Sequence, residues 1–129
     1  MPVKTERVED HLMLPEYYEL SEETAHAIND AKGSGKNMIF CGTTVVRAVE
    51  DACVEGRVVP QKKQTEIFMY PGYRFRMVEH MLTNFHLPCS TPLLLVSALA
   101  GKDRIFSAYK EAMEKEYRFF SYGDAMLIW

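Results

Sequence analysis

The segment that most constrains the fold is residues 81–101, where a short apolar run, a polar loop and an apolar helical segment follow one another. Residues 93–100 are apolar on nearly every side, so a helix there has to be buried by the rest of the chain. The loop before it, residues 83–91, holds an Asn, a His, a Ser and two Thr, which is more polar than a plain connection requires. Because loops held by rigid elements concentrate binding and catalytic groups, we expect a site at this strand-to-helix turn.

Strand-like and helix-like segments alternate along the 129 residues. The patterns predict strands near residues 37–41, 66–70, 81–83 and 125–128, and helices near 21–32, 44–54, 91–100 and 103–116. Residues 11–20 also fit a strand, and Pro15 places it at a sheet edge because proline cannot donate a ladder hydrogen bond. The polar residues 55–65 are expected to form a loop. Alternating strands and helices predict a single α/β domain, residues 1–129, with a largely parallel sheet flanked by helices.

Helix-capping residues accompany two turns that are rich in polar side chains. Ser21 and Ser90 are expected as N-caps of the first and third helices, and Thr43 or Thr44 as the N-cap of the second. In open α/β sheets, ligands bind at the carboxyl ends of strands beside helix N-termini, where free N–H groups favour anions. The turns 41–44 and 83–91 therefore suggest one site for a polar ligand that bears a carboxylate or a phosphate. The simpler alternative is that these residues only cap helices, and for Ser90 alone it is the better one.

Composition argues against several classes of protein. No apolar run approaches the roughly 20 residues of a membrane span, and the charged N-terminal segment is not a signal peptide. A net charge of −3 argues against a general nucleic-acid binder. The three cysteines form no CxxC pair, which is typical of reduced thiols in the cytoplasm.

Two short patterns resemble binding motifs without completing them. Residues 33–36, Gly-Ser-Gly-Lys, lack the first glycine and the final Ser or Thr of a phosphate-binding loop, so we interpret them as a helix stop and turn. His80 and His86 do not have the spacing of a zinc site, and no metal is expected. The basic residues of the polar segment 55–65 are expected to form a solvated face rather than an RNA contact.

The C-terminal run 117–126 combines aromatic residues, an Arg and an Asp in one connection. Aromatic faces attract positive charge and a carboxylate adds to that attraction, so the run could flank a cation. A packed loop with Phe119 and Phe120 in the core explains the same residues equally well.

Five motifs occur in one order along the chain. They are Gly-Thr-Thr-Val-Val-Arg at 42–47, Tyr-Pro-Gly-Tyr-Arg-Phe at 70–75, Leu-Thr-Asn-Phe-His-Leu-Pro followed by Ser-Thr at 82–91, Val-Ser-Ala-Leu-Ala-Gly at 96–101, and Arg-Phe-Phe-Ser-Tyr-Gly-Asp-Ala-Met at 118–126. This series resembles the C-terminal part of S-adenosylmethionine:tRNA ribosyltransferase-isomerase, an enzyme family of queuosine biosynthesis. The resemblance covers essentially the whole chain.

The resemblance implies an enzyme that moves the ribosyl part of S-adenosylmethionine onto the aminomethyl group of a 7-deazaguanine base in a tRNA anticodon. Adenine and methionine leave, and the product is epoxyqueuosine. By residue type and position, His86 and Asp124 are our candidates for handling the proton beside the sulfonium. The candidates for binding the donor are six polar residues and two aromatic ones that could face the sulfonium: Thr43, Thr44, Arg47, Asn84, Ser90 and Thr91, with Phe85 and Tyr122.

The family enzyme is much longer than this chain and has a second, mostly β domain upstream. The resemblance implies that residues 1–129 are the C-terminal part of the catalytic α/β domain, in a gene that is truncated or whose missing part is supplied elsewhere. We expect the isolated chain to be cytoplasmic, to be inactive by itself and to self-associate through surface that the missing part would cover. The alternative is a non-catalytic module that keeps a ligand pocket or only an assembly surface.

Overall fold

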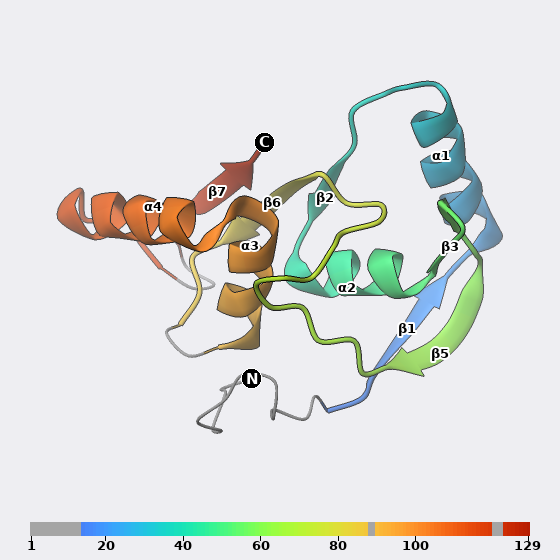
Figure 1. The fold of residues 1–129 in the computed structure, drawn as a ribbon, viewed down its shortest axis with the longest axis horizontal. Helices are drawn as coiled ribbons and strands as arrows, with labels where there is room; N and C mark the ends of the chain where they lie inside the picture. Colours follow the sequence, from blue (N-terminus) through green and yellow to red (C-terminus); the bar gives the residue numbers. More distant parts are fainter. Residues whose placement is uncertain (1–13, 88–89, 120–122) are drawn as a thin grey trace.

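The computed structural model describes residues 14–87, 90–119 and 123–129. Figure 1 shows the elements, which in chain order are β1 (Glu16–Leu20), α1 (Glu22–Gly33), β2 (Ile39–Cys41), α2 (Thr43–Asp51), β3 (Cys53–Val54), β4 (Arg57–Val58), β5 (Gln61–Thr65), β6 (His80–Asn84), α3 (Thr91–Ala100), α4 (Lys102–Glu114) and β7 (Ala125–Ile128). Within these ranges, no helix has both the length and the apolar character needed to span a membrane.

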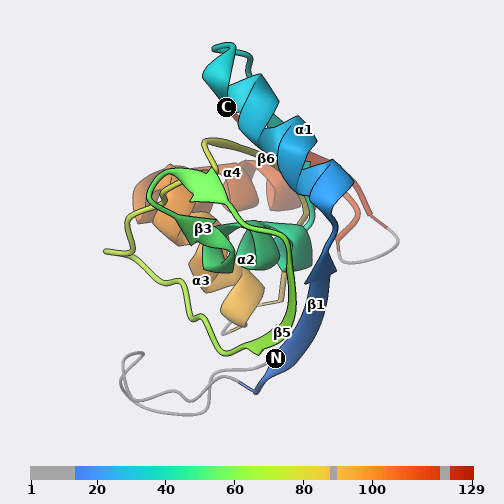
Figure 2. The same ribbon diagram turned by 90° about the vertical axis from the view of Figure 1, so that its right-hand side faces the viewer.

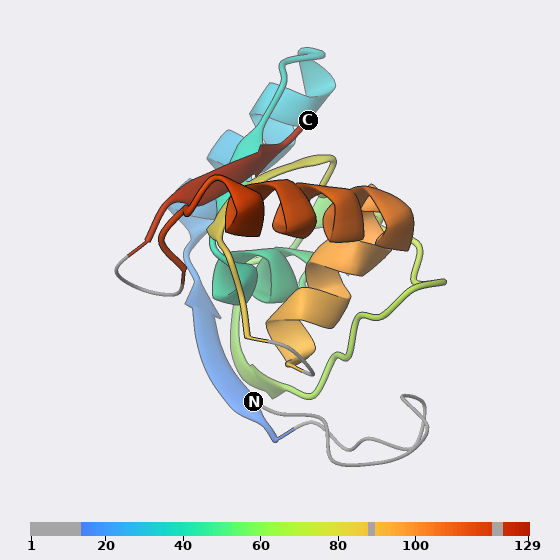
Figure 3. The ribbon, with the colours of Figure 1, turned by 90° about the vertical axis from the view of Figure 1, so that its left-hand side faces the viewer.

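The central sheet contains three strands in the order β2-β6-β7. Strands β2 and β6 run parallel, with Phe40 opposite Met81, whereas β7 runs antiparallel to β6, with Met126 opposite Thr83. The other pairings of described strands, β1 with β5 and β3 with β4, are antiparallel. The structure thus combines helices and strands, as expected, but its central sheet is not the expected largely parallel one. The chain after α4 returns beside β6 in the opposite direction, which makes the sheet mixed (Figure 3).

The polar segment 55–65 is not the loop that its composition predicts, because it contains β4 and β5. Figure 2 shows β5 lying beside β1, where Lys62 forms an ion pair of 3.4 Å with Glu19. Both of these side chains are exposed, so the strand carries no apolar alternation by which it could be recognised. The strand expected at residues 66–70 does not form. A turn follows these residues, with the Tyr73 N–H donating to the Tyr70 carbonyl at 2.9 Å.

Most helix ends follow local sequence signals. Ser21 caps α1 by accepting a hydrogen bond from the Thr24 N–H, and Ser90 caps α3 by accepting one from the Leu93 N–H. Gly101 has a φ of 95° and joins α3 directly to α4. The second helix differs from the prediction, because its N-cap is Gly42 rather than a threonine, and it ends earlier, before β3. Gly42 has a φ of 94°, a conformation that residues other than glycine rarely adopt.

The core lies between the central sheet and helices α2, α3 and α4. Val46 and Val96 are completely buried, as is Met81 on the facing side of the sheet. Every residue of α3 is buried or half-buried, which agrees with its nearly uniform apolar sequence. The opposite side of the sheet is more open, since Ile39 and Leu127 are each about half exposed.

Candidate functional site

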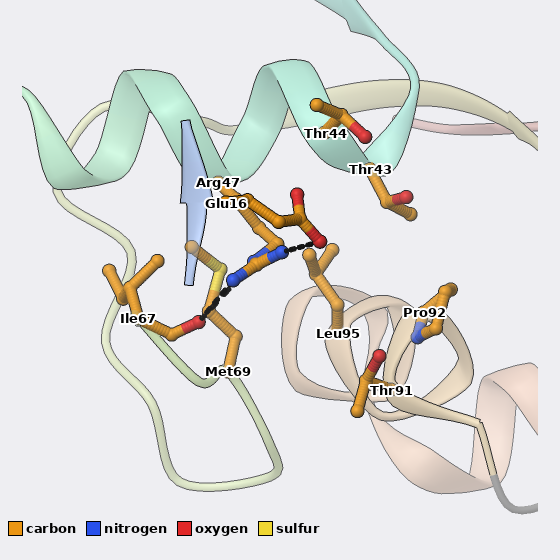
Figure 4. A pocket seen from close by; sticks show the side chains of 9 residues that line it. All are labelled: Glu16, Thr43, Thr44, Arg47, Ile67, Met69, Thr91, Pro92 and Leu95. Carbon is orange, nitrogen blue, oxygen red and sulfur yellow. Dashed lines mark hydrogen bonds and ion pairs between the residues drawn. The ribbon is translucent and has the colours of Figure 1, made fainter. Parts of the chain in front are cut away.

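Four of the residues predicted for the site line one cavity, which lies between the start of α2 and the start of α3 (Figure 4). The cavity has a volume of about 150 Å³. Its lining residues come from β1, α2, α3 and the segment after β5: Glu16, Thr43, Thr44, Arg47, Ile67, Met69, Thr91, Pro92 and Leu95. The polar side chains of the lining include one positive charge, one negative charge and three hydroxyl groups.

Arg47 is the buried charge of this cavity. It lies one turn into α2, and its Nε and Nη2 atoms donate to the Ile67 carbonyl at 3.3 Å and 3.2 Å. Its Nη1 atom forms an ion pair of 2.5 Å with Glu16 Oε1. The side chain of Arg47 is only 9% exposed, whereas that of Glu16 is 47% exposed. Arg47 is therefore an inward-pointing group paired with a carboxylate, not a surface charge.

The two helix N-termini beside the cavity are capped differently. Ser90 caps α3 and also donates to the Leu87 carbonyl at 2.6 Å, so its hydroxyl is already committed to local structure. Thr91, the next residue, is buried in the cavity wall. Gly42 has no side chain with which to cap α2, and Thr43 and Thr44 lie inside the helix rather than at the cap. No cap side chain therefore accepts from the backbone N–H groups of the first turn of α2. The hydroxyls of Thr43 and Thr44 lie beside these N–H groups.

His86 lies beside a different cavity. That cavity has a volume of about 600 Å³ and is lined by His86 and six mostly apolar residues: Leu93, Phe106, Tyr109, Met113, Tyr117 and Phe119. Among the described residues, none lines both cavities. Helix α3 contributes Leu93 to one and Leu95 to the other, so the two open on different sides of this helix. That His86 and the Arg47 cavity act on one donor stays a prediction.

The side chain and the backbone of His86 each have a hydrogen-bond partner. Its Nε2 atom shares a hydrogen bond of 3.1 Å with the Thr83 hydroxyl, and its backbone N–H donates to the Tyr109 hydroxyl at 2.7 Å. Burial lowers the pKa of His86, because the cationic form loses hydration. The side chain is therefore neutral at pH 7 and can accept a proton.

The other predicted residues lie around the end of β6. Asn84 is exposed, and Phe85 is buried with its ring centroid 4.9 Å from that of Phe119. Asp124 directly precedes Ala125, the residue opposite Asn84 in the sheet, so it lies at the same sheet edge. Its carboxylate accepts from the Arg118 N–H at 2.9 Å.

Two residues of the C-terminal run that bear on its interpretation, Phe120 and Tyr122, lie outside the described residues. Phe119, which is described, is half-buried and stacks on Phe85, as the packed-loop interpretation expects. Gly123 passes so close to the Arg118 carbonyl that a Cβ atom there would collide with it. The described ends of the run therefore lie against each other, with the Asp124 N–H donating to the Arg118 carbonyl at 2.8 Å.

Three residues that matter to the site were missed by the sequence interpretation. Glu16 and Tyr109 reach their partners from more than 20 residues away, and no local pattern indicates such contacts. Glu50 did carry a signal, because it lies four residues after Val46 on the apolar face of α2, where an acid needs buried partners. It is completely buried and accepts hydrogen bonds from four groups.

His80 and His86 belong to no group of metal-binding side chains in the part of the chain that the structure describes. No three His, Cys, Asp or Glu residues there come close enough together to hold a metal ion.

Comparisons with known proteins agree with one another. A sequence model of the family described as "Queuosine biosynthesis protein" matches residues 1–128. The S-adenosylmethionine:tRNA ribosyltransferase-isomerase of Natranaerobius thermophilus is 59% identical over 128 residues, which are 98% of this chain and 37% of that protein. The protein of the same name from Carboxydothermus hydrogenoformans is 50% identical over 127 residues, which are 98% of this chain and 38% of that protein.

A solved structure gives the same result. The crystal structure of S-adenosylmethionine tRNA ribosyltransferase from Thermotoga maritima aligns with a TM-score of 0.83 and 42% sequence identity, over 88% of this chain and 40% of that chain. This chain spans less than two fifths of the length of the two curated relatives described above. Since the family model matches nearly every residue, the chain belongs to the queuosine biosynthesis protein family, where it corresponds to the C-terminal portion of the S-adenosylmethionine:tRNA ribosyltransferase-isomerases.

Proposed function

We propose that this chain supplies the donor-binding part of an S-adenosylmethionine:tRNA ribosyltransferase-isomerase. The reaction transfers and isomerises the ribosyl moiety of S-adenosylmethionine to 7-aminomethyl-7-deazaguanine in tRNA, with release of adenine and methionine and formation of epoxyqueuosine. The observation that carries the proposal is the gathering of Thr43, Thr44, Arg47 and Thr91 around one cavity in a chain of this family.

The small volume of the cavity supports a donor site that is formed partly by this chain and partly by the rest of the family protein. Pockets that enclose a whole drug-sized ligand measure roughly 300–1,000 Å³. A cavity of about 150 Å³ therefore holds one end of the donor. The rest of the donor and the tRNA would contact the portion of the family protein that this chain does not cover, which is why we propose that the isolated chain is inactive.

His86 fits the proton-handling part of the reaction. A proton on carbon beside a sulfonium has to be removed by a base, and a neutral imidazole is such a base. Burial keeps His86 neutral at pH 7, and the hydrogen bond to Thr83 fixes the direction of the ring. Asp124 is the second candidate for this role, at the same sheet edge as Asn84. Asn84, Phe85, Ser90 and Tyr122 stay candidates for contacts to the donor.

A completed protein tests the proposal. This chain would replace the matching portion of the Natranaerobius thermophilus relative, to which it is 59% identical over 128 residues. We expect this completed protein to release adenine from S-adenosylmethionine in the presence of substrate tRNA. The isolated chain should release none, and His86→Asn in the completed protein should abolish most of the release.

The same comparison separates the proposal from its alternative. The alternative is that the chain is a non-catalytic module that keeps a ligand pocket or only an assembly surface. If the completed protein folds, binds tRNA and still releases no adenine, the residues of this chain have lost the chemistry and the alternative holds.

A further inference from the structure

The cavity around Arg47 holds two opposite charges in direct contact. Arg47 is buried, so an anion can reach it only from inside the cavity, whereas Glu16 is half exposed at the cavity margin. The guanidinium has five N–H donors, and its partners within the described chain, Ile67 and Glu16, use three of them. One donor on each terminal nitrogen is thus left for a ligand. A phosphate would be repelled by Glu16, so the pair favours a ligand that itself carries adjacent opposite charges.

The remaining lining favours one end of the donor over the other. An adenine ring is bound by stacking on aromatic side chains, and none of the described residues that line this cavity is aromatic. Its apolar wall consists of aliphatic side chains and a thioether, with Met69 and Leu95 fully buried. Such a wall suits a flexible chain of methylene groups and a sulfur atom.

The first turn of α2 adds a second anion-binding element to the same cavity. Gly42 leaves this helix without a capping side chain, and Thr43 and Thr44 add hydroxyls at its positive end. The carboxylate of an amino acid could therefore be bound by helix N–H groups, by hydroxyls and by Arg47 together.

From these observations we propose that the cavity is the subsite for the methionine end of the donor. Arg47 and the start of α2 bind the carboxylate, and Glu16 binds the ammonium group. This assignment rests on the proposed function for the identity of the donor, and it adds Glu16 as a residue that selects an α-amino acid.

Ligands that lack one charge test the assignment on the chain itself, because Glu16, Arg47 and the start of α2 all belong to it. L-Methionine, N-acetyl-L-methionine and L-methionine methyl ester would each be titrated into the 129-residue protein and followed by ¹H–¹⁵N NMR. We expect L-methionine to shift the amides of Thr43, Thr44 and Thr91 with saturable, millimolar binding. The other two ligands, which lack the ammonium and the carboxylate charge respectively, should bind at least tenfold more weakly.

Two matched substitutions separate a ligand contact from a structural role. Glu16→Gln should weaken L-methionine at least fivefold and leave N-acetyl-L-methionine unchanged, because only the former presents an ammonium group. Glu19→Gln, on the same strand but paired with Lys62, should change neither. If Glu16 only positioned Arg47, both ligands would weaken equally, and this result overturns the assignment.

Absence of any saturable shift with L-methionine, or equal affinity for all three ligands, also overturns it. Neither result depends on turnover, so failure of the subsite and failure of the proposed function are distinguishable. If the chain binds methionine but the completed protein releases no adenine, the proposed reaction is refuted and the amino-acid site stands. If the completed protein releases adenine but the chain binds no methionine, only the proposed methionine subsite is refuted.

Discussion

Glu50 is the residue whose replacement should damage the fold most. Its carboxylate is completely buried in α2. Oε1 accepts from the Tyr73 hydroxyl at 2.9 Å and the Arg76 N–H at 2.8 Å, while Oε2 accepts from the Met77 N–H at 2.7 Å and the Val78 N–H at 3.0 Å. One side chain therefore satisfies three backbone donors and a hydroxyl in the segment that leads into β6. Burial, with a further contribution from Glu50, raises the pKa of Tyr73 to about 12.

Two substitutions at Glu50 should have graded effects. In Glu50→Ala, all four donors lose their acceptor. Those of Met77 and Val78 belong to buried residues, and each buried donor left unsatisfied costs about 1–3 kcal/mol. In Glu50→Gln, the amide NH₂ has to face the donors of one of the two oxygens. This costs one or two charge-assisted hydrogen bonds, each worth about 1.5–3 kcal/mol. Domains of ordinary stability have only about 5–15 kcal/mol in total, so Glu50→Ala should leave the chain close to unfolding.

Urea denaturation followed by circular dichroism measures both changes. Glu114→Gln is the control, because Glu114 is exposed on α4 and should change the free energy of unfolding by less than about 0.5 kcal/mol. If Glu50→Gln were as stable as the wild type, the buried carboxylate would not be organising residues 73–78, and the reasoning from hydrogen-bond satisfaction would be wrong.

Three further predictions concern the backbone, acid stability and association. Gly42→Ala should destabilise the chain by about 1–2 kcal/mol in urea denaturation, because the φ of 94° at residue 42 strains any residue that has a side chain. The control, Gly33→Ala, should be neutral or stabilising because Gly33 does not have a positive φ. Equal effects of the two substitutions would contradict this. For Asp51, burial alone raises the pKa, but hydrogen bonds from Tyr18, Thr65 and Lys63 outweigh it and hold the pKa below 3.8. The unfolded state therefore binds the proton first, so stability is lost as the pH falls below about 4 toward the folded-state pKa, and the loss should be shallower in Asp51→Asn in urea titrations at stepped pH. The isolated chain should self-associate through its open sheet side, and light scattering that finds a monodisperse monomer at high concentration would refute this.

The sequence was most informative where structure depends on neighbouring residues. Ser21 and Ser90 predicted the starts of their helices correctly because a cap side chain bonds to a residue three positions away. Strand β5 could not be found in this way, since its polar residues are held by pairing with β1, more than 40 residues earlier. The central sheet is mixed rather than parallel for a related reason, because the direction of β7 depends on how the chain returns after α4 and not on the residues of β7.

The site residues, too, divide into those that neighbouring residues indicate and those that only contacts between distant segments bring together. Thr43 and Thr91 could be proposed from their positions at strand-to-helix turns, and Arg47 from the family resemblance. All three line one cavity. Glu16 could not be proposed, because only the folded chain brings β1 against α2. The separation of His86 from this cavity also depends on how α3 packs, which no sequence pattern indicates.

The central claim is that the cavity around Arg47 binds S-adenosylmethionine. Steady-state kinetics of adenine release by the completed protein test it most directly, with Arg47→Ala as the variant and Arg57→Ala, an exposed arginine on β4, as the control. We predict that Arg47→Ala lowers kcat/KM for S-adenosylmethionine more than tenfold, which corresponds to about 1.4 kcal/mol of lost stabilisation, while the control is unchanged. Unchanged kinetics in a folded Arg47→Ala protein would contradict the account, because the donor would then bind elsewhere.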